Sequence, residues 1–334
     1  MVKWLIRGAV GILVLIVVIL LAGAMYERRA RARVAAQYPP SGKLVDIGGR
    51  NIQIDCRGSG SPVVVFEAGR DLRGSLSWYL VHNDVAAFTR ACAYSRAGIL
   101  WSDPKSSPPT AKGAAADLHA TLEKAGERGP FVLVGHSAGG PGILVYTKYY
   151  PAEVAGLVFV DSSHPDQFDR LEAAMKGFKR PALDLDARLR RAFAWAGAVR
   201  MQTPPPLPDN SEAMKIVDAY GPVSFVAATR EIDEDPEWFG EAGTVHSLGA
   251  RPVFVLSGMK FVPERLGITP EVERERQKVW REMQKELAAL STVSRHDEDF
   301  EADHYVQNSN PPHVVAAVKW VVEKVRETST SSGR

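Results

Sequence analysis

The chain opens with an unbroken apolar stretch and then changes to short apolar runs separated by polar segments. Residues 8–25 contain no charged side chain. An apolar helix of this length just spans a hydrocarbon core of roughly 30 Å, so we predict one transmembrane helix here. A removable signal peptide is the alternative, because Lys3 and Arg7 form a basic start and Ala22-Gly23-Ala24 resembles a cleavage site. The length of the apolar run favours the anchor.

After Tyr38-Pro39-Pro40 the chain alternates between two kinds of segment. Short apolar runs typical of strands occur at 43–47, 52–56, 63–67, 91–94, 131–134, 157–160 and 253–256, and helical periodicity occurs at 114–124, 142–150, 271–290 and 314–325. The first two strands are joined by Gly48-Gly49, a hairpin turn signal. Two hairpin strands followed by strand–helix alternation predict an α/β fold with a mostly parallel sheet covered by helices on both faces.

One of these apolar runs carries the strongest chemical signal in the chain. The strand-like residues 131–134 lead directly into Gly135-His136-Ser137-Ala138-Gly139, and a helical pattern follows. A sharp strand-to-helix turn lifts a serine hydroxyl above a sheet, and small residues two positions before and after it permit the crowding. We therefore predict a nucleophile elbow at Gly135, His136 and Gly139, with Ser137 as an acylated nucleophile; a structural serine in a turn is the alternative.

The order of these motifs resembles the α/β-hydrolase fold superfamily over residues 43–326. It runs from a loop after the third strand through Tyr94-Ser95-Arg96-Ala97-Gly98 and the elbow to Asp161, which ends the strand 157–160, and finally to Asp303-His304. Within the superfamily the chain is similar to serine esterases and lipase-like members, because epoxide hydrolases and haloalkane dehalogenases carry Asp in the elbow. The resemblance implies that Ser137 accepts an acyl group from the substrate.

The resemblance also implies a base and an acid that follow the nucleophile in the order Ser, acid, His. We predict His304 as the base, since it precedes the loop 305–310 and the last helix, whereas His296 and His313 are less well placed. The segment 295–301 before it is unusually polar for an interior strand.

The acid is harder to assign from the sequence. Relatives carry an Asp after the strand that is here 253–256, but the following residues, 258–264, contain only Glu264 as a carboxylate. Asp161 is the other position that the fold uses. We predict Asp161, because a carboxylate at a strand end is held more rigidly than one in a loop, and keep Glu264 as the alternative.

Acyl transfer needs hydrogen-bond donors for the developing oxyanion. The backbone amide of Ala138 directly follows the nucleophile, and the loop after the third strand should supply the other donor, which we assign to the amide of Arg70. The side chains of Arg70 and Asp71 either narrow the site or form a surface ion pair.

The segment between the strands 157–160 and 253–256 is too long for a loop and contains helical stretches. In this fold such an insertion resembles a cap over the active site, and Phe193, Trp195, Met201 and Phe225 are candidates to line an apolar pocket beneath it. The expected organisation is a membrane anchor with basic flank (1–33), a hydrolase core in two parts (34–161 and 250–327), a helical cap (162–249) and a disordered tail (328–334).

Cys56 and Cys92 are the only cysteines. If the fold places their strands side by side, the two thiols can form a disulfide, which would indicate an oxidising compartment; two buried, reduced cysteines are the alternative. The four arginines after the apolar run instead favour a cytoplasmic domain by the positive-inside rule. We expect the domain outside the cytoplasmic membrane.

Charge and motif content narrow the function further. The residues after 33 hold 35 basic and 38 acidic side chains, which gives no sign of a nucleic-acid partner. Neither a metal-binding spacing nor a cofactor motif occurs, so none is expected. We predict a serine hydrolase, anchored in the membrane through residues 8–25, that cleaves a carboxylic ester or a related small acyl substrate, with a lipid-like compound as one candidate. The alternatives are thioesterase, lactonase, amidase or peptidase activity, or a non-catalytic binding or scaffold role on this fold.

Overall fold

A single eight-stranded sheet organises the protein. The computed structural model describes residues 2–175, 178–180, 182–263 and 267–332. The strand order is β1-β2-β4-β3-β5-β6-β7-β8. The strands are β1 (Lys43–Asp46), β2 (Asn51–Arg57), β3 (Val63–Glu67), β4 (Ala91–Tyr94), β5 (Phe131–His136), β6 (Val154–Val160), β7 (Val253–Gly258) and β8 (Ser294–Asp299). Strands β1 and β2 pair antiparallel, as do β2 and β4, and the other neighbours are parallel, as the sequence predicts.

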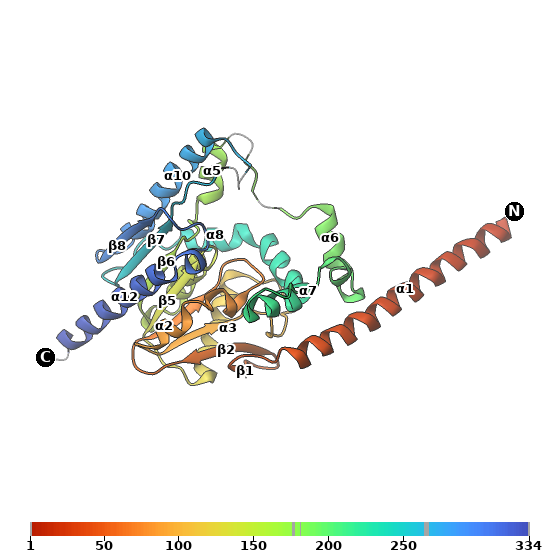
Figure 1. Cartoon of the computed structure of the whole chain (residues 1–334), viewed down its shortest axis with the longest axis horizontal. Coiled ribbons are helices and arrows are strands. Elements are labelled where there is room, and N and C mark those ends of the chain that lie inside the picture. The colour runs from red at the N-terminus through yellow and green to blue at the C-terminus, as the bar shows by residue number, and fades with distance from the viewer. Residues whose placement is uncertain (1, 176–177, 181, 264–266, 333–334) are drawn as a thin grey trace.

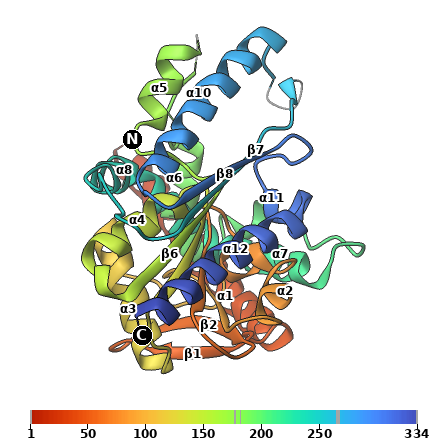
Figure 2. The same cartoon turned by 90° about the vertical axis from the view of Figure 1, so that its left-hand side faces the viewer.

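Helices cover both faces of this sheet because alternate strand residues point to opposite sides. Val63 and Val65 pack in one core with α3 (Ala111–Ala125), α4 (Gly139–Tyr149) and α10 (Pro270–Ala289). Val64 and Phe66 pack in a second core with η1 (Gly74–Trp78), α2 (His82–Ala86), α11 (Val306–Ser309) and α12 (Pro311–Ser332). Figure 2 shows α12 crossing this second face. Near-continuous apolar strands are typical of a sheet buried on both sides.

The polar strand before His304 has a simple explanation in the topology. Strand β8 is the last strand in the order, so it has β7 as its neighbour and an open edge on the other side. An edge strand tolerates charged side chains and is protected by them from pairing with other chains. Because β8 is an edge strand and not an interior one, its polar sequence is compatible with its place in the sheet.

The last helix extends further than expected. Composition predicts a disordered tail from Thr328, but α12 continues to Ser332, and residues 333–334 lie outside the described part of the chain. The hydroxyls of Thr328 and Ser329 donate to the backbone carbonyls four residues earlier, at 2.6 and 3.0 Å. These bonds give the two hydroxyls acceptors within the helix, so their polarity does not end it at Thr328.

The segment between β6 and β7 is helical, as predicted for the cap. It contains α5 (Gln167–Ala174), α6 (Leu185–Ala192), η3 (Ala194–Ala196), η4 (Arg200–Gln202), α7 (Glu212–Asp233) and α8 (Asp235–Gly243). A short η2 (Pro151–Glu153) precedes β6. Figure 1 shows α6 standing away from the sheet, on the side from which the first helix leaves the body.

That first helix, α1 (Val2–Gln37), projects from the body (Figure 1). Its most apolar 18-residue window has a mean hydropathy of 2.9 and is 0% buried, so by length and composition it could cross a membrane. Its last third is docked instead: Glu27 and Ala30 are buried, and Val34 packs beside Trp101 and Tyr220.

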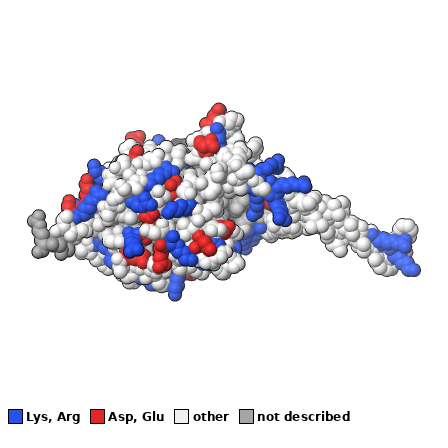
Figure 3. Space-filling model, turned by 90° about the horizontal axis from the view of Figure 1, so that it is seen from below, with Lys and Arg blue, Asp and Glu red and all other residues white. Residues whose placement is uncertain are grey.

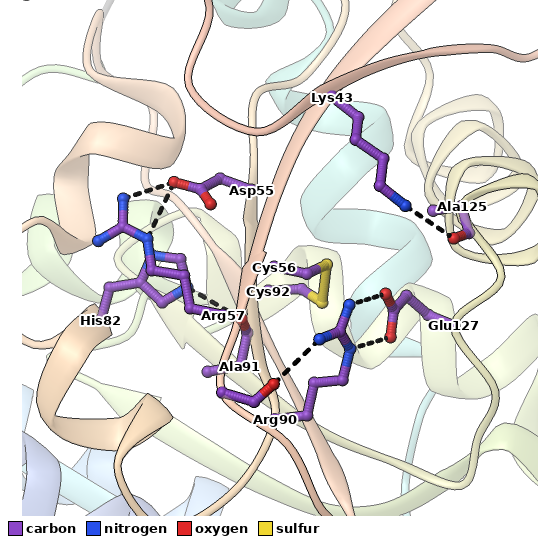
Figure 4. The surroundings of a disulfide bond; sticks show 11 residues. Lys43, Asp55, Cys56, Arg57, His82, Arg90, Ala91, Cys92, Ala125 and Glu127 are labelled. Atoms are coloured by element: carbon purple, nitrogen blue, oxygen red, sulfur yellow. Dashed lines mark hydrogen bonds and ion pairs between the residues drawn. A yellow bond between two sulfur atoms is a disulfide. The ribbon is translucent and has the colours of Figure 1, made fainter.

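Cys56 and Cys92 lie directly opposite each other in the antiparallel pair β2–β4 and form a disulfide (Figure 4). The structure thus contains the bonded pair rather than two reduced thiols. Beside it, Arg90 makes a two-pronged ion pair with Glu127, with both nitrogen–oxygen distances 2.6 Å. The carboxylate of Glu127 lies close enough to both sulfurs to share a metal ion with them, but metal binding requires thiolates, which the disulfide does not offer.

Candidate active site

Ser137 stands on a strained turn between β5 and α4. Its backbone φ is +52°, a region that residues other than glycine rarely adopt. The turn leaves no space for side chains on either flank: a Cβ on Gly135 would lie 2.6 Å from the carbonyl oxygen of Gly139, and one on Gly139 would lie 2.6 Å from that of Glu67. The small residues of the motif are thus required by close backbone contact, and the strain is concentrated at the serine, as is common at functional sites.

His304 and Asp161 lie in line with this serine. The hydroxyl of Ser137 is 3.0 Å from Nε2 of His304, and Nδ1 of His304 is 2.7 Å from Oδ2 of Asp161. Asp161 directly follows β6 and His304 follows β8, so all three side chains sit at the carboxyl edge of the parallel strands. The structure therefore brings together the predicted nucleophile, base and preferred acid, while the alternative acid Glu264 lies outside the described residues.

Two donors that the sequence did not reveal fix the carboxylate of Asp161. The amide of Gly258 and the indole Nε1 of Trp280 both donate to its Oδ1, at 3.0 and 2.8 Å. The other oxygen, Oδ2, remains for His304. The only sequence signal for Trp280 was its place in an amphipathic helical segment, which predicts burial but not a partner.

The two histidines of the site, His304 and His136, have pKa values shifted in opposite directions. Burial disfavours the charged form of His304, but the hydrogen bond and the charge of Asp161 outweigh it, so the pKa of His304 lies above its ordinary value. His136 is buried in the elbow, and burial together with the charge of His304 holds its pKa well below the usual range. Neutral His136 donates through Nε2 to the backbone carbonyl of His304 at 2.8 Å. His136 thereby positions the loop that carries His304.

The loop after β3 lies against the elbow, where the oxyanion donors are expected. A Cβ on Gly69 would lie 3.0 Å from the Cβ of Ser137. Arg96 holds this loop in place, donating to the carbonyls of Ala68 and Gly69 at 2.8 and 2.9 Å. Ala138 is the N-cap of α4, whose first amides lack partners within the helix and favour negative charge.

Buried charges connect this loop to the cap. Arg96 forms an ion pair with Glu67 on one side. On the other side it donates twice to Glu231 of α7, at 2.8 and 2.9 Å. Arg70 pairs with Asp235 at the start of α8; the Asp235 side chain is buried and that of Arg70 is 14% exposed. Of the two alternatives for Arg70 and Asp71, the structure does not contain the surface ion pair: Arg70 binds Asp235, and Asp71 accepts from the hydroxyl of Ser77 at 3.0 Å.

A cavity of about 350 Å³ opens beside Asp161 and His304. Its lining includes Trp280, Val262, Arg276 and Tyr305 together with His304. The candidates that the sequence suggested for an apolar pocket lie elsewhere. Phe193, Trp195 and Met201 are 42%, 51% and 67% exposed on the outer surface of the cap, and Phe225 is half-buried beneath Arg190. These side chains do form an apolar surface, but it lies on the outside of the cap and not in a pocket around Ser137.

The substitution Trp280→Phe tests the support of Asp161. It keeps the ring in the core and removes the indole donor. A hydrogen bond to a charged group contributes about 1.5 to 3 kcal/mol, so we expect kcat to fall about 10- to 100-fold with little change in KM. Steady-state kinetics of both variants measure this. Trp320→Phe, on the far face of the sheet, is the matched control, and an equal loss in both variants would contradict the assigned role.

The chain matches known proteins in sequence over part of its length. Residues 63–204 match a family model described as alpha/beta hydrolase fold. A protein of Hormonema carpetanum described as a probable transporter, efuK, is 33% identical over 138 residues, which are 38% of this chain and 19% of that protein. An uncharacterised Bacillus subtilis protein, YbdG, is 22% identical over 166 residues, 48% of this chain and 49% of that one. The chain thus spans between about a fifth and a half of the length of the curated relatives it matches.

Solved structures resemble the chain over more of its length. Est816, described as an N-acyl homoserine lactone degrading enzyme, is 17% identical with a TM-score of 0.56, covering 83% of this chain and 99% of its own. A putative epoxide hydrolase from Pseudomonas aeruginosa is 18% identical with a TM-score of 0.62, covering 86% and 97%. At these identities the likeness concerns the fold.

Proposed function

The chain has the α/β-hydrolase fold, and from this premise we propose that it is a serine hydrolase that cleaves a carboxylic ester or a related acyl compound through an acyl-enzyme at Ser137. The observation that carries the proposal is the continuous line of hydrogen bonds from Ser137 through His304 to Asp161. A fold alone supports many chemistries, but this constellation on a strained elbow is suited to acyl transfer.

The reaction would proceed in two acyl transfers. His304 removes the proton of Ser137 as its oxygen attacks the substrate carbonyl, and then donates that proton to the leaving group. Asp161 orients the imidazole and stabilises its charged form. The backbone amides of Ala138 and Arg70 are the proposed donors to the oxyanion. Water, activated by His304 in the second step, releases the acid and restores the serine.

We also propose that α1 anchors the enzyme in a membrane, with the catalytic domain on the extracytoplasmic face. The disulfide between Cys56 and Cys92 supports that face, because such bonds persist in oxidising compartments. The contact between α1 and the cap supports retention of the helix: a Cβ on Gly23 would lie 2.3 Å from the carbonyl oxygen of Ala196, and Gly23 belongs to the alternative cleavage site.

A fluorophosphonate probe tests the acyl-enzyme directly. Such a probe phosphonylates an activated serine, and we expect purified wild-type protein to be labelled at Ser137, as located by peptide mass spectrometry. Ser137→Ala and His304→Ala should abolish labelling, whereas Ser106→Ala, a change to an exposed serine, should leave it intact. A folded wild-type protein that is not labelled would contradict the proposal and favour a binding or scaffold role.

A further inference from the structure

The cap carries an unusual concentration of exposed apolar side chains. Outside α1, ten large apolar residues are exposed in the described part of the chain, and six of them fall within residues 185–207. These are Leu185, Leu189, Phe193, Trp195, Met201 and Leu207, with exposed fractions of 72%, 50%, 42%, 51%, 67% and 63%. A concentration of this kind marks an interaction surface rather than the scattered exposure of an ordinary soluble domain.

The sequence of this segment, which we call the cap patch (185–207), is amphipathic. Leu185, Leu189 and Phe193 are spaced four residues apart, which places the first two on one side of α6 and continues the stripe at its end. Arg190 and Arg191 belong to the same helix and bind Asp186 and Asp233 at 2.9 and 2.6 Å. An apolar stripe beside a basic face is the pattern of helices that lie in the plane of a membrane interface.

The structure places the cap patch against the apolar helix. Ala196 of η3 touches Gly23 so closely that no side chain fits there, and Gly197 lies beside the ring of Tyr26. Gly23 is inside the uncharged run 8–25. Figure 1 shows α6 on the side of the body toward which α1 projects. A bilayer spanned by α1 would therefore reach the level of η3.

A buried ion-pair cluster fixes this arrangement. Glu27 is 3% exposed and accepts from Arg200 at 2.7 and 3.2 Å and from Arg31 at 2.7 Å. Burial alone opposes ionisation, but the two arginines outweigh it, so the pKa of Glu27 lies below its ordinary value. Because the helix cannot swing freely from the cap, the position of α1 in a membrane also sets that of the cap patch.

The charges around the junction suit a lipid surface. Arg28, Arg29, Arg31 and Arg33 follow the apolar run on α1, and all four are exposed. Figure 3 shows Lys and Arg side chains gathered where the helix leaves the body. Arginine side chains at this level can bind lipid phosphate groups, which both leaflets carry, and a Trp such as Trp195 is typical of the interfacial zone.

We propose that the cap patch lies in the headgroup and outer acyl region of the same bilayer that α1 spans. The inference rests on the membrane anchoring proposed above and adds a second, independent point of contact. This arrangement places the cap, and the active site beneath it, at the lipid surface. The fitting substrate is therefore an amphiphilic acyl compound that partitions into that surface.

The chain offers a convenient background for a test, because its only two cysteines are joined in the disulfide. Each of three variants, Leu189→Cys, Ile16→Cys and Phe300→Cys, then has one free thiol for an NBD fluorophore, provided that no reductant is present. Phe300 is the matched control: it is 61% exposed and directly follows the edge strand β8, away from α1. The full chain is reconstituted in nanodiscs of phosphatidylcholine and phosphatidylglycerol with or without spin-labelled lipid.

We expect spin-labelled lipid to quench the fluorophore at Leu189→Cys and at Ile16→Cys, and to leave the one at Phe300→Cys unaffected. Quenching at Ile16→Cys without quenching at Leu189→Cys would overturn the cap contact while leaving the anchor in place. Protection of Leu189→Cys from aqueous iodide without lipid quenching would show that a second copy of the chain covers the patch, and would also overturn it. No quenching at Ile16→Cys would instead refute the anchoring itself.

Discussion

Replacing Ser137 and His304 together by alanine is expected to lower kcat no further than replacing either one alone. Each single change should cost about 10⁶-fold, because the serine is a weak nucleophile without the base and the base has nothing to activate without the serine. Their hydrogen bond of 3.0 Å makes them one functional unit. The residual rate would come from the oxyanion donors and substrate binding, which both substitutions leave in place.

Steady-state kinetics of the two single variants and the double variant on an activated ester measure this coupling. Ser106→Ala, at an exposed serine, serves as the control and should retain wild-type kcat. Losses that multiply in the double variant would mean that Ser137 and His304 act independently, which is incompatible with a shared proton transfer. Circular dichroism of each variant checks that the fold is intact.

The second large effect is expected at the acid. Asp161→Asn keeps the shape of the side chain but reverses one hydrogen-bonding role, so His304 loses the acceptor at 2.7 Å that holds its tautomer. We expect kcat to fall about 10⁴-fold. The matched comparison is Glu264→Gln at the alternative acid, which should leave kcat within a small factor of wild type.

The same substitution should also move the pH profile. His304 acts as a base only when neutral, so kcat/KM rises with pH through its pKa, which lies above the ordinary value near 6.5. Without the charge of Asp161, burial lowers the pKa of His304, and the acid limb shifts to lower pH while the plateau falls. An unchanged acid limb in Asp161→Asn together with a shifted one in Glu264→Gln would assign the acid to Glu264.

Local sequence patterns were informative where the chemistry depends on neighbours along the chain. The elbow is one example: a buried strand, a turn and a helix follow one another within residues 131–149, and the small residues that the turn requires are adjacent to Ser137. The hairpin is another, because Gly48 and Gly49 adopt φ values of +110° and +88° and donate to the side chain of Asp46.

Patterns were less informative where the outcome depends on which elements become neighbours. Trp280 and Gly258 hold Asp161 from elements about a hundred residues away, and nothing in their own surroundings predicts that pairing. The sequence left open whether Arg70 narrows the site or forms a surface ion pair, and the structure pairs it with the buried Asp235 at the start of α8. The exposed aromatic residues of the cap were assigned to a pocket, since an apolar residue in a helix looks the same whether it faces a core or a membrane.

The sequence by itself determined the α/β fold, the apolar helix and the elbow at Ser137, because each of these follows from a periodicity or a local motif. The candidate partners His304 and Asp161 came from the resemblance to a known fold family. Only the tertiary structure decided that the three side chains form one hydrogen-bonded line, that Cys56 faces Cys92, and that the cap rests on the first helix at Gly23. These contacts join segments that are distant in sequence, and strand order and helix packing fix which of them meet.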